Sequence, residues 1–184
     1  MTVEYLKKAD KTSASGEDDV RATVETVLAE IEAGGDDKAR EYSAKFDKWD
    51  GDIIATRHDM AAAADKVSQT LKDDIRFAHD NVRKFAEAQK ATIQDCEVEV
   101  VPGLIAGQKQ MPVSAAGCYV PGGRYSHIAS AIMTVTTAKV AGVDHIAACS
   151  PPRPGIGINP AILYTLDLCG ADSVLNLGGI QGIA

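Results

Sequence analysis

The sequence predicts an α/β protein in which an N-terminal helical segment and a β-hairpin precede a parallel sheet with helices on both faces. All seven prolines follow residue 100, whereas most of the charged residues precede it. After residue 96, apolar segments of strand length alternate with segments of helix length, which is typical of parallel strands joined by helical crossovers. We therefore expect a helical segment over 1–95 and an α/β portion over 96–184.

The first part has the apolar spacing of helices. Apolar residues over 20–31 recur every three or four positions, Ser15 or Asp18 is a candidate N-cap, and Gly34-Gly35 is expected to end this helix. Three further helices are expected over 36–46, 60–67 and 72–90. The aromatic side chains of this part, Phe85 included, are expected to anchor the core.

Beyond residue 96 the apolar period changes to two. Residues 97–101 and 104–110 flank Pro102-Gly103 and are expected to form a hairpin at an edge of the sheet. Strands over 117–120, 145–149 and 173–177 are then expected to alternate with helices over 126–141 and 160–169. Each strand runs into a turn rich in small residues, and open α/β sheets bind ligands at such carboxyl ends.

The segment 117–130 joins a strand to a helix through Gly122-Gly123. Such a turn can hold a phosphate-bearing ligand, because glycines let the backbone approach closely and the first turn of a helix favours an anion. The segment lacks the GxGxxG spacing of the usual dinucleotide fingerprint. A strand-to-helix connection that binds nothing is therefore the alternative.

Composition narrows the class of partner. A net charge of −7 and a pI near 5.0 argue against nucleic acid or an anionic membrane surface, so a small-molecule ligand is expected. The sequence shows neither a secretory signal nor a membrane span, which predicts a cytoplasmic protein. The four cysteines form no CxxC pair and are expected to be reduced core thiols. The four histidines have no metal-ligand spacing, so no metal site is predicted.

Five motifs in order carry a resemblance to a known family. They are GCYVPGG at 117–123, TAKVAG at 137–142, CSPP at 149–152, LCGA at 168–171 and LGGIQGIA at 177–184. Together they resemble the histidinol dehydrogenase family, weakly over the N-terminal helices and strongly from about residue 100. The resemblance implies an incomplete Rossmann-like domain in a zinc-dependent, NAD-linked, homodimeric enzyme that oxidises a primary alcohol through an aldehyde to a carboxylate.

The resemblance also assigns cofactor-binding residues. Tyr119 and Gln181 match family residues that contact NAD, although a core tyrosine and a helix-start glutamine bonded to backbone are the alternatives. Secondary cofactor-binding candidates, which would supply turn geometry and backbone N–H groups, are Gly122, Gly123, Gly178 and Gly179.

The catalytic residues are expected beyond Ala184, where the sequence stops inside the LGGIQGIA motif. The family's zinc ligands and its Glu-His acid/base pair have no counterpart in residues 1–184. We therefore predict no catalytic residue here and expect no turnover from this chain alone, because that pair transfers the protons and the metal polarises the substrate oxygen. The resemblance covers less than half of the family's usual length, so a fragment of a longer protein is expected.

The sequence RYSHIASA at 124–131 resembles the sulfopropanediol 3-dehydrogenase branch of the family, which oxidises 2,3-dihydroxypropane-1-sulfonate to sulfolactate with NAD. Arg124 and His127 are the substrate-binding candidates, because a guanidinium and an imidazole beside a helix N-terminus suit a sulfonate. Arg124 could instead contact the nucleotide or form a structural salt bridge, and His127 could cap or pack the helix. Oxidation of L-histidinol to L-histidine in histidine biosynthesis, a non-catalytic nucleotide-binding module and a helical interaction protein are the alternative functions.

Overall fold

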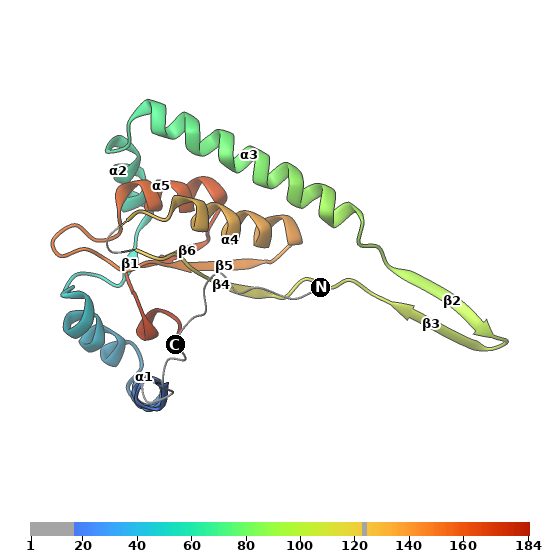
Figure 1. The fold of residues 1–184 in the computed structure, drawn as a ribbon, viewed down its shortest axis with the longest axis horizontal. Coiled ribbons are helices and arrows are strands. Elements are labelled where there is room, and N and C mark those ends of the chain that lie inside the picture. Colours follow the sequence, from blue (N-terminus) through green and yellow to red (C-terminus); the bar gives the residue numbers. More distant parts are fainter. Residues whose placement is uncertain (1–16, 123–124) are drawn as a thin grey trace, which may run out of the picture.

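The computed structural model describes residues 17–122 and 125–184. Three residues singled out above, Ser15, Gly123 and Arg124, lie outside this part of the chain. Within it, a four-stranded sheet carries helices, and a separate two-stranded hairpin projects from the body (Figure 1). The expected α/β fold class is confirmed.

The N-terminal segment begins with α1 (Glu17–Tyr42), which Gly35 divides into two helices. Gly35 has φ 58° and ψ −144°, a conformation open to glycine alone at low cost, so the expected helix end at the glycine pair is confirmed. A short π-helix, η2 (Ser43–Asp47), follows, and Lys48 then takes a left-handed conformation. Asp18, a candidate cap, lies inside α1 instead.

Two capped helices complete this segment, α2 (Arg57–Asp65) and α3 (Gln69–Ala91). Thr56 and Asp59 form a capping box, in which each side chain bonds to the other residue's backbone N–H. The Ser68 side chain caps α3 by accepting from a backbone N–H of its first turn. Both helices therefore begin where the local sequence satisfies their free N–H groups.

The sheet has the spatial order β1-β6-β5-β4. Its strands are β1 (Ile54–Ala55), β4 (Ala115–Tyr119), β5 (His145–Cys149) and β6 (Ser173–Leu175). Strands β4, β5 and β6 run parallel as predicted, and Tyr119 pairs with Cys149, which pairs with Leu175. Their carboxyl ends thus share one edge. Strand β1 adds an antiparallel strand that the sequence did not predict, because two residues are too few to show a period.

One face of the sheet is covered by α4 (Ile128–Ala141) and α5 (Pro160–Cys169). On their other side, α3 packs on α4 and α2 packs on α5 (Figure 1). Both α4 and α5 therefore lie between two layers, which accounts for apolar residues around most of their circumference. The core is continuous from Ala55 in β1 to Val174 in β6. The segments 1–95 and 96–184 therefore contribute to one core, and their division into two domains stays a prediction.

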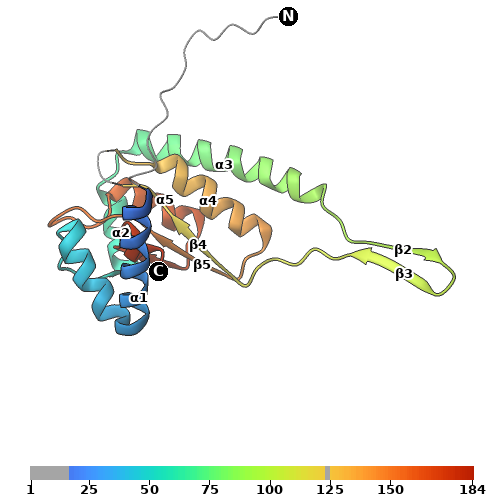
Figure 2. The same ribbon diagram turned by 60° about the horizontal axis from the view of Figure 1, so that its bottom comes forward.

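The hairpin consists of β2 (Cys96–Val101) and β3 (Leu104–Gln108), as predicted, but its expected place at an edge of the main sheet is wrong. It forms a sheet of its own and extends away from the body in both ribbon views (Figures 1 and 2), while β1 and β4 are the edges of the main sheet. All residues of both strands are exposed. A period of two specifies which two strands pair, but it does not specify a third neighbour.

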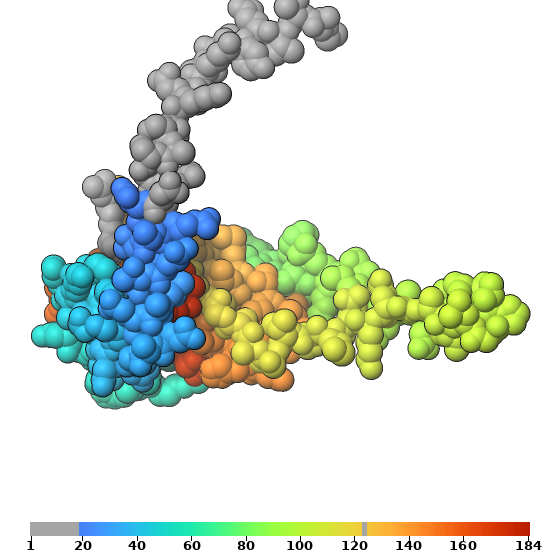
Figure 3. All heavy atoms as spheres, turned by 90° about the horizontal axis from the view of Figure 1, so that it is seen from below, coloured from blue at the N-terminus to red at the C-terminus, as the bar shows by residue number. Residues whose placement is uncertain are grey.

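The opposite side of the sheet carries α1 and the short 3-10 helix η3 (Ile180–Gly182), so helices lie on both sides (Figure 1). Seen from this side, α1 (blue) lies against the C-terminal residues (red) (Figure 3). The 3-10 helix η3 covers the carboxyl end of β5, where the Cys149 thiol donates to the Gly182 carbonyl at 3.0 Å and Cys149 is 5% exposed, whereas His145 at the start of that strand is exposed.

Two expectations about side-chain burial are wrong. Phe77 is 73% and Phe85 is 66% exposed, because the buried face of α3 runs through Ile75 and Ala86 and leaves both rings outside it. Cys96 is an exposed thiol on the hairpin, whereas the other three cysteines are buried and free as expected. In the described ranges, the helices are all too short or too polar to cross a membrane.

Candidate functional site

Three turns meet at the carboxyl edge of the parallel strands. Pro151, after β5, lies between the turns that follow β4 and β6. A Cβ atom added to Gly122 would lie 3.1 Å from Pro151 Cδ, and one added to Gly178 would lie 2.7 Å from Pro151 Cβ. A side chain at Gly178 is therefore excluded by the proline, which gives this predicted site glycine a packing role.

Tyr119 ties the first and third turns together. The half-buried Tyr119 hydroxyl accepts a hydrogen bond from the backbone N–H of Gly179, at 3.2 Å. Gly179 has φ 53° and ψ −141°, a conformation that strains any residue with a side chain. The phenol thus lies at the edge of the sheet, within the cluster of predicted cofactor-binding residues.

Gln181 is buried beneath the same turn, with 4% of its surface exposed. Its Nε2 atom donates to Oδ2 of Asp47 at 2.8 Å, so its partner is a carboxylate and not backbone. Its Oε1 atom is buried and has no hydrogen-bond partner in the described part of the chain. Buried polar atoms are nearly always paired, so this orphaned acceptor is suited to a ligand donor.

Ser150 provides a second orphaned group at this edge. The side chain is fully buried, and its Oγ atom has no partner among the residues that the structure describes. Its backbone N–H donates to the carbonyl of Leu175 at 3.2 Å, which continues the sheet pairing by one residue. A hydroxyl can both donate and accept, so Ser150 Oγ is a second buried polar group at this edge without a protein partner among the described residues.

Asp47 is the residue of this cluster that sequence reasoning missed. Its carboxylate accepts from Nε2 of Gln181. Burial raises the pKa of Asp47, and the backbone N–H of Gly178 and the amide of Gln181 oppose that rise by favouring the charged form. Nothing in the local sequence distinguishes Asp47 from the many solvated acidic residues around it.

Of the two substrate-binding candidates, Arg124 and His127, only His127 lies in the part of the chain that the structure describes. It occupies the N-cap position of α4 with φ −87°, and its side chain makes no capping hydrogen bond. Its carbonyl accepts from the N–H of Ser130 at 3.1 Å, so the backbone begins the helix without help from the ring. The imidazole is exposed and is available to a ligand at the edge.

The residues present do not fit a zinc site. Within 17–122 and 125–184, the His, Cys, Asp and Glu side chains form no group of three that could hold a metal ion. A structural or catalytic zinc needs at least three such ligands from protein. No zinc-dependent step is therefore assigned to the described residues.

Ala184, beyond which the catalytic residues are expected, lies two residues after the end of η3. Its backbone N–H donates to the carbonyl of Ile180 at 3.0 Å, and the residue is exposed. An alanine side chain has no group for acid/base chemistry or metal binding, and the location of the catalytic residues beyond Ala184 stays a prediction.

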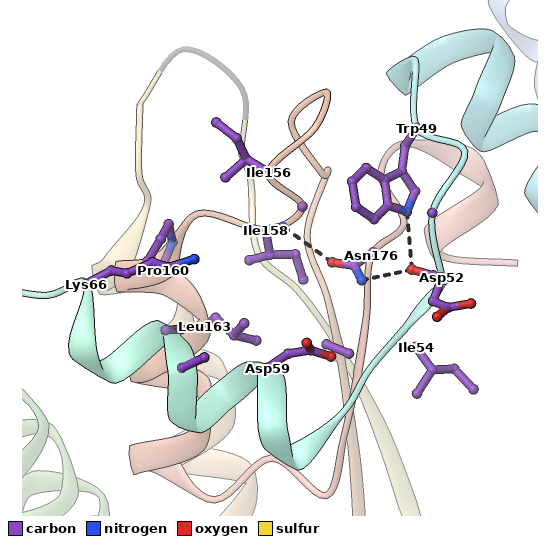
Figure 4. A pocket seen from close by; sticks show the side chains of 15 residues that line it. Trp49, Asp52, Ile54, Asp59, Lys66, Ile156, Ile158, Pro160, Leu163 and Asn176 are labelled. Atoms are coloured by element: carbon purple, nitrogen blue, oxygen red, sulfur yellow. Dashed lines mark hydrogen bonds between the residues drawn. The ribbon is translucent and has the colours of Figure 1, made fainter.

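A cavity of about 280 Å³ lies beside this cluster, between the Trp49 loop, α2 and the β5–α5 connection (Figure 4). Asn176 forms its inner wall by accepting from the Ile158 N–H at 3.3 Å and donating to the Asp52 carbonyl at 2.9 Å. The Trp49 indole donates to the same carbonyl at 3.2 Å. The polar groups of the inner wall thus bond to one another, and no local pattern indicates this cavity because its walls come from distant segments.

Comparison with known proteins places the chain in a family. The family model described as histidinol dehydrogenase matches residues 10–184. A sulfopropanediol 3-dehydrogenase of Ruegeria pomeroyi is 65% identical over 184 residues, which are 100% of this chain and 42% of that protein. A histidinol dehydrogenase of Methanosarcina barkeri is 41% identical over 172 residues, which are 92% of this chain and 39% of that protein.

The fold leads to the same group of proteins. The crystal structure of histidinol dehydrogenase from Elizabethkingia anophelis superimposes with a TM-score of 0.82 at 31% identity, covering 97% of this chain and 39% of that one. This chain therefore spans less than half the length of these relatives. The match of the family model over nearly all of its residues shows that the chain belongs to the histidinol dehydrogenase family.

Proposed function

We propose that this chain supplies the NAD-binding portion of a zinc-dependent alcohol dehydrogenase that oxidises 2,3-dihydroxypropane-1-sulfonate through an aldehyde to sulfolactate. The observation that carries the choice of substrate is the identity of 65% with a sulfopropanediol 3-dehydrogenase, against 41% with a histidinol dehydrogenase. The RYSHIASA sequence at 124–131 supports the same choice. L-Histidinol is the second candidate substrate, because the matching family is described as histidinol dehydrogenase.

The cofactor-binding residues in this proposal are those gathered at the carboxyl edge. Gln181 presents a buried amide with a free acceptor, and Tyr119 presents the edge of a phenol beside Gly179. Gly122 and Gly178 keep the neighbouring turns close to Pro151 and so hold the edge in shape. NAD, when bound, accepts a hydride from the substrate carbon, and these residues bind and orient it.

Substrate recognition in this proposal uses the start of α4. The exposed His127 ring stands where the helix dipole favours an anion, which suits a sulfonate. Arg124 is proposed as a second sulfonate contact from sequence alone. The zinc ligands and the acid/base pair are proposed to belong to the part of the relatives that this chain does not match, which in the proposed whole enzyme follows Ala184.

We also propose that the whole enzyme is a homodimer. Five large apolar side chains of the hairpin are more than half exposed, and they are Val98, Val100, Val101, Leu104 and Ile105. An isolated two-stranded hairpin is only marginally stable in water, so an ordered arm of this kind needs a covering surface. Sedimentation of the whole enzyme with Val98→Asp and Ile105→Asp tests this, because an unchanged dimer would contradict a role of the hairpin in assembly.

The test of function uses a hybrid enzyme, defined as residues 1–184 followed by the part of the Ruegeria pomeroyi sulfopropanediol 3-dehydrogenase that this chain does not match. NADH formation is followed with zinc, offering dihydroxypropanesulfonate or histidinol, and the unaltered relative is the control. We expect turnover of the sulfonate. Turnover of histidinol alone, or an inactive but folded hybrid beside an active control, would contradict the proposal.

A further inference from the structure

We propose that Asp47 is a positioning residue of the nucleotide site, which holds the Gly178–Gln181 turn in its binding conformation from the N-terminal helical segment. The inference rests on the proposed function, because it concerns the same cluster. It extends the site by a residue that lies 134 positions from Gln181 in the sequence. It also gives the N-terminal segment a part in cofactor binding.

The contacts of Asp47 fix both ends of the turn. Its carboxylate accepts, at 2.8 Å, from Nε2 of Gln181 at the end of the turn, and the backbone N–H of Gly178 at the start of the turn favours its charged form. The bond to Gln181 also decides how the amide is oriented. With Nε2 committed to the carboxylate, Oε1 is the atom left without a partner, so Gln181 presents an acceptor to a ligand.

The backbone on either side of Asp47 is irregular, with a π-helix before it and a left-handed residue after it. Asp47 is the last residue of the π-helix η2, and the Lys48 N–H closes that turn on the carbonyl of Ser43. Lys48 then has φ 56°, the single positive φ among the non-glycine residues of the described ranges. A left-handed residue is a common way to end a helix, whereas π-helical turns are rare and are frequent at functional sites.

A role in stability alone does not account for the residue. Burial raises the pKa of Asp47, which means that the fold disfavours its charged form relative to water. A neutral side chain at this position would avoid that cost. The carboxylate is therefore better explained by the conformation that it imposes on the turn.

The test measures two properties of Asp47→Ala in the 184-residue chain. Amide hydrogen exchange by NMR reports on the turn, and we expect the Gly178 N–H to exchange about 10- to 100-fold faster once its charged acceptor is gone. Titration with NAD, followed by fluorescence of the single tryptophan, Trp49, is expected to show about 10-fold weaker binding, the equivalent of one lost hydrogen bond. Chemical unfolding should show a folding equilibrium constant lowered about 5- to 30-fold, a loss of about 1–2 kcal/mol, because Nε2 of the buried Gln181 is left without an acceptor. The variant should remain folded in the binding measurement.

Two variants serve as controls. Asp47→Asn keeps one acceptor oxygen and is expected to give values between those of the alanine variant and the original chain. The exposed Asp50→Ala, three residues further on, is expected to change neither property. This pattern separates positioning of the turn from a general effect of removing an acidic residue.

The outcomes distinguish the positioning role of Asp47 from the binding of NAD by residues 1–184. Unchanged exchange at Gly178 in Asp47→Ala, or faster exchange with unchanged NAD affinity, would overturn the inference and leave NAD binding in place. Failure of the unsubstituted chain to bind NAD would instead overturn the proposed function of residues 1–184, and the inference with it. Weaker binding together with faster exchange supports both.

Discussion

The hydroxyl of Tyr119 accepts a hydrogen bond from the backbone N–H of Gly179, at 3.2 Å, and so joins the strands on either side of β5. Tyr119 ends β4, and Gly179 belongs to the turn after β6. Pro151, in the turn after β5, lies between these two turns, and Gly178 is packed against it. The carboxyl edge of the sheet is thereby held as one unit before any ligand binds.

Replacing Tyr119 by phenylalanine removes the acceptor of the Gly179 N–H. We expect about 1 kcal/mol less stability toward urea and about 3- to 10-fold weaker NAD binding, because the turn loses one hydrogen bond. The matched control is Tyr164→Phe, since the Tyr164 hydroxyl is buried and has no hydrogen-bond partner in the described ranges. Equal effects of the two substitutions would show that the Tyr119 bond has no special role.

Substitution of Gly179 by alanine tests the conformation of the turn. An alanine with φ 53° and ψ −141° is strained, so we expect about 1–3 kcal/mol of destabilisation and the loss of most NAD affinity. Gly35→Ala is the control, because Gly35 has nearly the same conformation, φ 58° and ψ −144°, in α1. It should cost similar stability. Equal loss of NAD affinity in both variants would mean that strain alone explains the effect.

The reactivity of the cysteines follows from their burial. Burial raises the pKa of Cys149 to about 11, so its thiolate is scarce at pH 8, whereas Cys96 is exposed on the hairpin. We expect a maleimide to label one cysteine rapidly in the native chain and all four after denaturation. Mass spectrometry identifies the labelled peptide. Rapid labelling that persists in Cys96→Ser would contradict the burial of the other three cysteines, and a labelled Cys149 peptide would contradict its packing under η3.

Asp172 makes stability depend on pH. Its hydrogen bond from the Ile146 N–H, at 2.8 Å, and its ion pair with Lys139, at 3.5 Å, lower its pKa in the folded state. A carboxyl with a lowered folded pKa stabilises the fold above its ordinary pKa, 3.8, and this contribution is lost as the pH falls through the folded value. We expect Asp172→Asn to lose about 1 kcal/mol in urea unfolding at pH 7.

That difference between the original chain and Asp172→Asn should shrink as the pH falls below about 4, where the carboxyl is protonated in the unfolded chain, and should vanish once the pH passes below the lowered pKa of the folded state. The exposed Asp144→Asn is the control, and we expect it to change stability little at either pH. A destabilisation by Asp172→Asn that stays constant down to the lowest pH would show that the charge of Asp172 contributes nothing.

Local sequence patterns predicted most elements of the fold. Gly35 ended a helix as expected because its conformation excludes other residues, and the three parallel strands were recognisable because each runs into a turn of small residues. These features depend on neighbouring residues, which a pattern records directly.

Features made by distant contacts were not predictable in this way. The hairpin was assigned to the wrong sheet, and Phe85 was expected in a core that lies on the neighbouring face of α3. Asp47 and Trp49 are placed by contacts with the turn and the loop that follow β6 and β5, far along the chain. The predicted site residues Tyr119, Gln181 and Gly179 do lie together, and their role toward NAD stays a prediction.

The most direct test of the account is hydrogen–deuterium exchange of the hybrid enzyme with and without NAD. We predict that NAD slows exchange in the turns after β4 and β6, at residues 119–122 and 178–182, and has little effect on the hairpin. Protection confined to the appended part of the relative, or to the walls of the Trp49 cavity, would contradict the assignment of the cofactor site to the carboxyl edge of this sheet.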